Sequence, residues 1–192
     1  MKYKLLSEPT TNYKANKNID IGYHTYFLSL AHSNLSGYNV CPMANKLIDP
    51  KNNKLSNCSS VCVGYNGFAA IFKSVMKARI RKTKMFYEQR DQFIKLLIKD
   101  IQKGIKSSLN KGFIPTFRLN AYSDIKWENV NFTYENKNYK NIFELFSDIT
   151  FYDYTKIPNR KTPKNYEITY SFCGNEKHLK NELKNGLNVA IV

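Results

Sequence analysis

The sequence predicts an α/β fold in which a mostly parallel sheet carries helices across its faces. Segments rich in β-branched and aromatic residues alternate with segments of helical periodicity, and polar turns separate them. Alternation of this kind is typical of parallel strands joined by helices. At 192 residues, of which 42% are hydrophobic, we expect one α/β domain over residues 1–192. No apolar run is long enough for a membrane-spanning helix, so no membrane partner is expected.

The first third of the chain contains one strand between polar segments. Residues 1–20 are rich in Lys and Asn and predict an irregular lead-in. Residues 21–30 combine aromatic and β-branched side chains, which indicates a strand. Residues 45–57 are rich in Asn, Lys, Asp and Pro and predict a surface loop insert. The short, polar N-terminus does not resemble a secretory signal, so reduced cysteines in a cytoplasm are expected.

The rest of the chain predicts helices and strands in turn. A long helical region follows a turn at 64–67 and ends before Gly112, which suits the left-handed residue after a helix. Its apolar face is marked by Ile94, Leu97, Ile98, Ile101, Ile105 and Leu109. A hairpin is expected around 135–138, short helices at 141–146 and 176–185, and strands at 113–119, 149–154, 166–172 and 187–192.

The last strand suggests how this sheet is completed. It is apolar and has no predicted neighbour after it, which leaves an open sheet edge. We therefore expect a partial TIM-barrel-like sheet that is incomplete at the C-terminus, or a second chain or protomer that covers the edge.

Three of the four cysteines lie close together in the sequence and predict a metal site. Cys41 precedes the insert, and Cys58 and Cys62 follow it in a Cys-x3-Cys spacing. Because the insert can loop out, the three thiolates can meet and form a soft-ligand site for an iron–sulfur cluster or for zinc. Three ligands would leave one iron of a four-iron cluster open, whereas the distant Cys173 is a candidate fourth ligand. Buried or disulfide-bonded cysteines remain the alternative to a metal site. His32, which lies shortly before Cys41, could ligate the metal or could be an ordinary loop histidine.

Polar side chains follow the predicted strands and indicate a second part of the same site. The carboxyl ends of parallel strands meet at one edge, where ligand sites form. We expect the cysteines to face catalytic or substrate-orienting groups and cofactor-binding hydroxyls there. The alternative is that Arg118–Asp124 or Arg160–Asp153 are structural ion pairs. The catalytic candidates are Arg118, Asn120, Asp124, Asp153, Lys156 and Arg160, and the cofactor-binding candidates are Ser123, Tyr154 and Ser171.

The charge balance favours a polyanionic partner. The net charge is +15, from 30 Lys and Arg against 15 Asp and Glu, which suits nucleic acid or a nucleotide. Richness in Lys, Asn, Tyr and Ile also follows from AT-rich codons, so composition alone explains part of this excess. A basic, aromatic-flanked helix can bind phosphates, although a solvated face is the simpler interpretation. The nucleic-acid-binding candidates are Lys77, Arg79, Arg81, Lys82 and Lys84.

Several motifs occur together in this sequence: Asn-x-Cys-Pro at 39–42, Cys-x3-Cys at 58–62, residues 77–83, Arg118-Leu119-Asn120 with 123–125, and the decapeptide 151–160. Together they resemble those of a phage-borne family called gene product 88. The resemblance runs from about residue 22 to residue 192 and implies a phage-related protein of the host cell cytoplasm. The sequence departs from the usual family pattern in two ways. The gap between the first two cysteines is longer here, and family members tend to continue past the strand at which this sequence ends.

A looser likeness connects the three cysteines and the α/β pattern with radical S-adenosylmethionine enzymes. The usual Cys-x3-Cys-x2-Cys spacing of that superfamily is absent here. The sequence is therefore compatible with two candidate functions. The first is an iron–sulfur enzyme, with a 4Fe-4S cluster and S-adenosylmethionine as a candidate ligand, performing radical or redox chemistry on a nucleic acid or nucleotide. The alternative is a basic nucleic-acid-binding module with structural zinc or packed cysteines.

Overall fold

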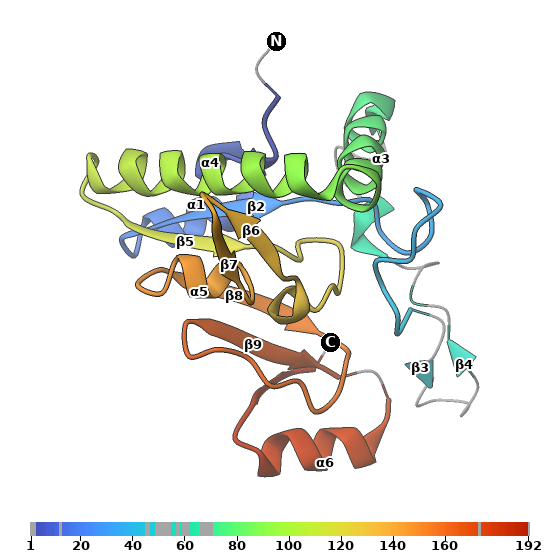
Figure 1. Cartoon of the computed structure of the whole chain (residues 1–192). Helices are drawn as coiled ribbons and strands as arrows, with labels where there is room; N and C mark the ends of the chain where they lie inside the picture. Colours follow the sequence, from blue (N-terminus) through green and yellow to red (C-terminus); the bar gives the residue numbers. More distant parts are fainter. Residues whose placement is uncertain are drawn as a thin grey trace.

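Six strands form one mostly parallel sheet at the centre of the protein (Figure 1). A computed structural model describes residues 3–11, 13–44, 47–48, 55–56, 58, 62–65, 71–172 and 174–191. The strand order is β1-β2-β5-β8-β9-β10, and only β1 runs antiparallel to its neighbour. The strands are β1 (Leu6–Ser7), β2 (Tyr23–Leu28), β5 (Ile114–Arg118), β8 (Thr150–Thr155), β9 (Tyr166–Ser171) and β10 (Asn188–Ala190).

The remaining elements connect these strands in chain order. Helices α3 (Lys73–Glu88) and α4 (Arg90–Leu109) lead from β2 to β5 and meet at Gln89. A hairpin of β6 (Phe132–Tyr134) and β7 (Lys137–Tyr139) and the short α5 (Ile142–Leu145) lead from β5 to β8. Helix α6 (Glu176–Lys184) joins β9 to β10. Because the five strands β2, β5, β8, β9 and β10 are parallel, their carboxyl ends lie at the same edge of the sheet.

The core lies between α4 and the sheet. Figure 1 shows α4 lying along β2 and β5, whereas α6 lies beside the opposite end of the sheet. Phe93, Leu97 and Ile101 are buried on α4, and they belong to one cluster with Tyr26 of β2 and Phe117 of β5. The expected apolar face is therefore present, except that Leu109 is 61% exposed at the end of the helix.

Gly104 explains how α4 approaches the sheet so closely. A Cβ atom at this position would lie 3.1 Å from the ring of Phe117 and 3.2 Å from that of Tyr26. Glycine has a lower helix propensity than a larger residue would have at position 104, but it allows the helix to pack closely against two aromatic rings.

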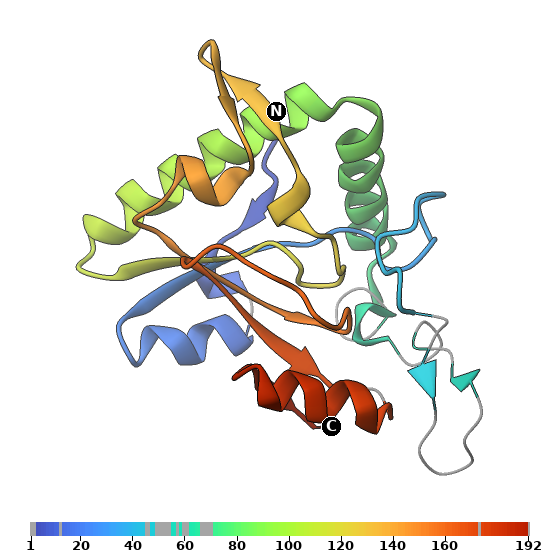
Figure 2. The ribbon, with the colours of Figure 1, turned by 60° about the horizontal axis from the view of Figure 1, so that its bottom comes forward.

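Two N-terminal regions differ from the sequence expectation. Residues 1–20, expected to be an irregular lead-in, contribute β1, the 3-10 turn η1 (Pro9–Thr11) and helix α1 (Tyr13–Ile19). These elements form because tertiary contacts override weak local signals: Leu5 and Leu6 are buried, and α1 packs on β2. Within the expected insert, β3 (Leu47–Ile48) pairs with β4 (Leu55–Ser56). Figure 2 shows this pair set apart from the main sheet.

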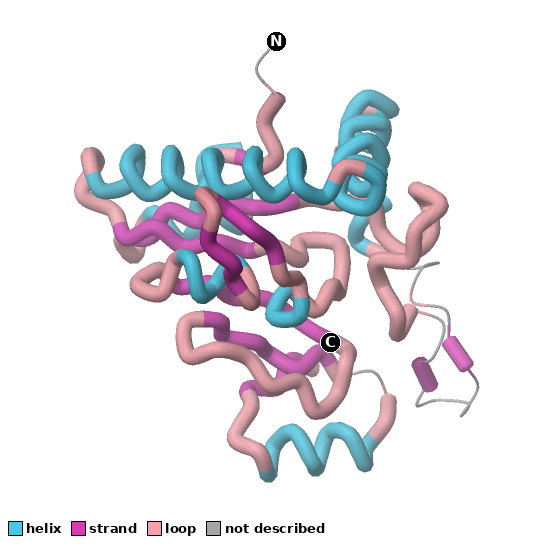
Figure 3. The backbone as a smooth tube through the Cα atoms, in the orientation of Figure 1, coloured by secondary structure: helices cyan, strands magenta, loops and turns pink. Residues whose placement is uncertain are grey.

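The expected turns and the hairpin are present. Gly112 follows α4 with a φ of 75°, in the left-handed region that glycine adopts without strain. Glu135 and Asn136 both have positive φ, which matches a tight turn between β6 and β7. In the part of the chain that is described, the sheet stays open, with β1 and β10 at its two edges (Figure 3). None of the described helices has the length and apolar character needed to cross a bilayer.

Candidate functional site

A cavity of about 150 Å³ lies at the carboxyl ends of the parallel strands. Strands β3 and β4 lie beyond these strand ends in Figures 1 and 2. Cys41, Cys58 and Cys62 line the cavity together with side chains that follow β5, β8 and β9. The opposing lining residues include Arg118, Asn120, Ser123, Asp124, Tyr154, Lys156 and Ser171. The thiols and the strand ends, which are distant in sequence, therefore share one hollow.

Backbone hydrogen bonds hold the cysteines on their side of the cavity. The N–H of Ala44 donates to the carbonyl of Cys41 at 3.0 Å, which forms a turn. The N–H of Cys58 then donates to the carbonyl of Ala44 at 2.8 Å, which ties the far end of the insert back to this turn. Cys41, Cys58 and Cys62 are thiols rather than halves of disulfides.

Two of the sulfur atoms accept backbone hydrogen bonds. Ser33 N–H donates to the Sγ of Cys41 at 3.3 Å, and Gly64 N–H donates to the Sγ of Cys62 at 3.3 Å. Such donors stabilise negative charge on sulfur. Several effects together raise the pKa of Cys41 to about 11: burial is the largest, Asp124, Cys62 and Cys58 act in the same direction, and the Ser33 donor opposes them. The thiol of Cys41 is therefore influenced by both other cysteines of the cavity.

The described side chains do not by themselves form a metal-ligating group. Among the residues that the structure describes, no set of three or more His, Cys, Asp or Glu side chains is arranged to hold a metal ion. Cys173, the candidate fourth ligand, lies outside the described residues. His32 is buried and does not line the cavity; its ring packs where a Cβ of Gly64 would lie, 2.5 Å from Nδ1. Burial, and to a lesser extent Arg79, lower the pKa of His32 and so favour the neutral ring.

Two cations face the thiols from the strand ends. Arg118 lies over the ring of Tyr154, at 4.9 Å, and its Nε is 3.4 Å from a carboxylate oxygen of Asp153 without forming a hydrogen bond. Lys156 Nζ donates to the hydroxyl of Ser171 at 2.9 Å. Lys156 forms no ion pair within the described part of the chain. This wall of the cavity therefore presents positive charge and donors.

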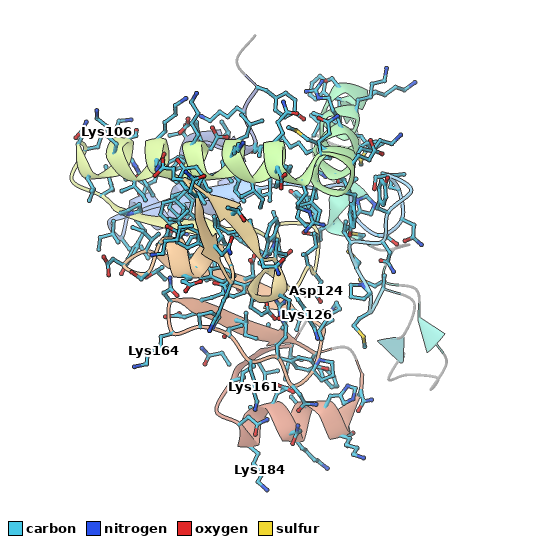
Figure 4. The ribbon with its side chains drawn as sticks, in the orientation of Figure 1. Lys106, Asp124, Lys126, Lys161, Lys164 and Lys184 are labelled. Carbon is cyan, nitrogen blue, oxygen red and sulfur yellow. The ribbon has the colours of Figure 1, made fainter. Side chains whose placement is uncertain are left out.

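Arg160 does not line the cavity but supports it from below. Its side chain is 1% exposed and binds Glu128 in a bidentate pair, with Nε–Oε1 at 2.9 Å and Nη2–Oε2 at 2.7 Å. Nη1 also donates to Asp124 at 3.1 Å. The other oxygen of Asp124 accepts the N–H of Lys156 at 2.8 Å, and Thr155 donates to Oδ1 at 2.8 Å. Asp124 lies in the interior in Figure 4, whereas Lys106, Lys164 and Lys184 point outward.

Asp153 and Asn120 are likewise occupied by structural hydrogen bonds. Asp153 is buried and accepts the N–H groups of Leu119 and Asn120 and the hydroxyl of Tyr166. Burial raises the pKa of Asp153 to about 7, against the opposing effect of Arg118 and these donors. The Asn120 side chain donates to the Ile125 carbonyl and accepts from Ser123, Ile125 and Trp127. These two residues shape the loop after β5, and their polar groups are engaged within the protein.

Ion pairs do close this edge of the sheet, but the partners differ from those expected. The sequence suggested Arg118–Asp124 and Arg160–Asp153, whereas the structure pairs Arg118 with Asp153 and Arg160 with Asp124. The exchange follows from position, because Arg118 is the last residue of β5 and Asp153 lies on the neighbouring strand β8. Glu128, to which sequence analysis assigned no role, is the second partner of Arg160. No local pattern in the sequence indicates this contact, because the two residues are 32 positions apart.

The basic helix α3 divides its cations between two faces. Arg79 is buried, donates to the Gly64 carbonyl at 2.8 Å and lies 3.9 Å over the ring of Tyr122. Lys82 donates to the Leu5 carbonyl, and burial lowers its pKa to about 8. Both side chains are therefore engaged within the protein, which does not support their predicted role in binding nucleic acid. Arg79 fastens the Cys62 segment to the loop after β5. Lys77, Arg81 and Lys84 are exposed on the opposite face.

The fold and the cavity together define an α/β protein with a cysteine-lined site at the carboxyl edge of a mostly parallel sheet. A family model described as gene product 88 matches residues 4–192. The chain therefore belongs to the gene product 88 family. Comparisons with curated proteins and with solved structures gave no match.

Replacing Arg160 by Ala should lower the free energy of unfolding by about 3–5 kcal/mol, because Asp124 and Glu128 would remain buried without their cation. Arg160→Lys should fall between Ala and wild type, since it keeps the charge and loses the bidentate geometry. Chemical denaturation measures both. The control is Lys180→Ala, which removes an exposed ion pair with Glu176 and should change stability by less than about 0.5 kcal/mol. Equal effects of Arg160→Ala and Lys180→Ala would contradict the structural role.

Proposed function

We propose that this protein is a phage-type iron–sulfur enzyme of the host cell cytoplasm that performs radical or redox chemistry on a nucleotide or nucleic acid. Cys41, Cys58 and Cys62 would hold the cluster, a 4Fe-4S type being the simplest. One observation carries the proposal: the three thiols line the same cavity as Arg118 and Lys156. A partial TIM-barrel-like arrangement of the single domain, with the site at its carboxyl edge, is consistent with the consecutive strand order.

The residues present suit a cluster in their chemistry. Thiolates are the ligands of iron–sulfur clusters, and N–H donors to the sulfur atoms tune such centres. Ser33 and Gly64 supply donors of this kind. Among the described residues the three thiols do not form a ligand set, so cluster binding would require the thiols to approach one another. The N–H of Cys58 donates to the carbonyl of Ala44, whose own N–H donates to the carbonyl of Cys41, and these two contacts support the proposal.

Each side of the cavity has a distinct task in this proposal. A cluster held by three thiolates keeps one iron available to a small molecule such as S-adenosylmethionine. Arg118 and Lys156 bind and orient an anionic group of the substrate, for which a phosphate is well suited. Tyr154 supports the guanidinium of Arg118, and the hydroxyls of Ser123 and Ser171 lie on the same lining. Asn120, Asp124, Asp153 and Arg160 position this wall and do not react.

The alternative is a nucleic-acid-binding module in which the same cysteines hold zinc or only pack. The half-buried thiols and the raised pKa of Cys41 favour this version if no metal is present. The two versions differ in what copurifies with the protein.

Protein prepared without oxygen should be brown and contain iron and acid-labile sulfide. Metal and sulfide analysis of wild type, of Cys41→Ser/Cys58→Ser/Cys62→Ser and of Cys173→Ser provides the test. The triple variant should be colourless, whereas Cys173→Ser should keep its iron because three thiolates suffice. A colourless, folded wild type that contains zinc would support the alternative. Wild-type protein that contains neither iron nor zinc would indicate that the cysteines only pack. Loss of iron in Cys173→Ser would show that Cys173 is a fourth ligand and would refute the open coordination position.

Arg118→Met and Lys156→Met should each weaken the binding of nucleoside phosphates about tenfold or more, because a hydrogen bond to a charged group contributes about 1.5–3 kcal/mol. Calorimetric titration of the wild type and both variants with nucleoside mono- and triphosphates measures this effect. Lys164→Met is the matched control, since Lys164 is exposed and points away from the protein (Figure 4). Equal binding by all four proteins would refute the role of the two cavity cations.

A further inference from the structure

Two further hollows lie on the helical layer, apart from the cysteine-lined cavity. A hollow of about 620 Å³ is bounded by α3 and α4, and another of about 330 Å³ runs along α4 and the segment around β1. The two hollows share Tyr3 and Leu96 in their linings and so adjoin. Figures 1 and 2 place the N-terminal segment beside α4, near its junction with α3. We call the two hollows together the α3–α4 groove.

The rim of the α3–α4 groove is positively charged. Its acidic residues are already engaged: Glu8 pairs with Lys4, Glu88 accepts the hydroxyl of Tyr38, and Asp100 accepts the N–H groups of Leu5 and Leu6. Five rim cations form no ion pair in the part of the chain that the structure describes. They are Lys77, Arg81 and Lys84 on α3 and Lys99 and Lys103 on α4.

The floor of the groove is apolar and contains an aromatic ring. Ile80, Met85 and Leu96 contribute side chains to it. The guanidinium carbon of Arg81 lies 4.8 Å from the centre of the Tyr3 ring, and its Nε donates to the Tyr3 hydroxyl at 3.2 Å. Stacking of bases on aromatic and guanidinium surfaces, with basic side chains along the backbone, is how proteins hold single strands.

We propose that the α3–α4 groove binds single-stranded nucleic acid. Phosphates contact the five rim cations, and unstacked bases rest on the Tyr3–Arg81 pair and the apolar floor. A duplex keeps its bases stacked inside, so it offers this floor nothing to contact. An acidic peptide would satisfy the rim but would leave the flat Tyr3–Arg81 pair without a planar partner.

The groove and the cavity share one helix. Lys77, Arg81 and Lys84 project from α3 opposite to Arg79, which donates to Gly64 beside the Cys62 segment. This inference extends the proposed function by naming a polymeric substrate class, but groove binding itself needs no metal. The Cys41→Ser/Cys58→Ser/Cys62→Ser variant should therefore bind single strands as wild type does, which separates failure of one proposal from failure of the other.

The test is fluorescence anisotropy of a labelled oligothymidylate, titrated with protein at several salt concentrations. Lys77→Ala/Arg81→Ala/Lys84→Ala should reduce the slope of log K against log salt by about 2, from about 0.7 for each lost phosphate contact. Lys161→Ala/Lys164→Ala/Lys184→Ala removes the same charge from exposed positions elsewhere and should leave the slope nearly unchanged. If the α3 variant does not fold, Lys99→Gln/Lys103→Gln tests the α4 side of the rim.

Three outcomes would overturn the proposal. Equal slopes for the α3 variant and the Lys161/Lys164/Lys184 variant would show that net charge alone attracts the strand. A duplex of the same length that binds as tightly as the single strand would exclude a role for the floor. Polyglutamate that displaces the oligonucleotide at equal charge concentration would indicate an acidic peptide partner instead.

Discussion

The buried guanidinium of Arg160 is the contact on which the architecture of the site depends. It joins Asp124 and Glu128 of the segment after β5 to the segment after β8. Both segments contribute residues to the cavity lining, whereas Arg160 itself does not. A buried cation between two carboxylates is costly to desolvate, so it is kept only where its geometry is satisfied. Five donated hydrogen bonds provide that geometry here. The cavity wall above is fixed as a consequence.

The polar residues at the strand ends therefore form two layers with different tasks. In the lower layer, Asn120, Asp124, Asp153 and Arg160 have their hydrogen-bonding groups engaged within the protein. In the upper layer, Arg118 and Lys156 face the thiols with donors to spare. Only side chains with free donors or acceptors can bind a substrate. The proposed function therefore depends on Arg118, Lys156 and the cysteines.

Much of the arrangement follows from the sequence because topology constrains it. Parallel strands in consecutive order must end at one edge, and this alone places Cys41, Arg118, Tyr154 and Ser171 near one another. The direction of each side chain does not follow, because it depends on neighbours distant in sequence. From the sequence, Arg79 and Lys82 are expected to be surface cations. Their positions on α3 instead direct both side chains toward other segments of the protein, where they donate to backbone carbonyls. The partners of Arg118 and Arg160 were exchanged for the same reason.

Local signals also failed where tertiary contacts decide the structure. The N-terminal twenty residues are polar on average, but Leu5 and Leu6 are buried and form hydrogen bonds with Asp100 of α4. A segment with two buried leucines becomes part of the core whatever its composition. The same segment supplies Tyr3 to the α3–α4 groove, so a region expected to be irregular shapes a proposed binding surface.

The central claim is that Cys41 and the Cys58–Cys62 segment meet in space, and thiol cross-linking tests it most directly. Metal-free, reduced protein with only Cys41 and Cys62, and protein with only Cys41 and Cys58, would be treated with dibromobimane, which fluoresces strongly once it has alkylated two thiols. We predict a fluorescent, intramolecular cross-link in both proteins, with peptide mapping assigning it to the two cysteines. Two separately alkylated cysteines, in protein that retains its native circular dichroism, would contradict the account.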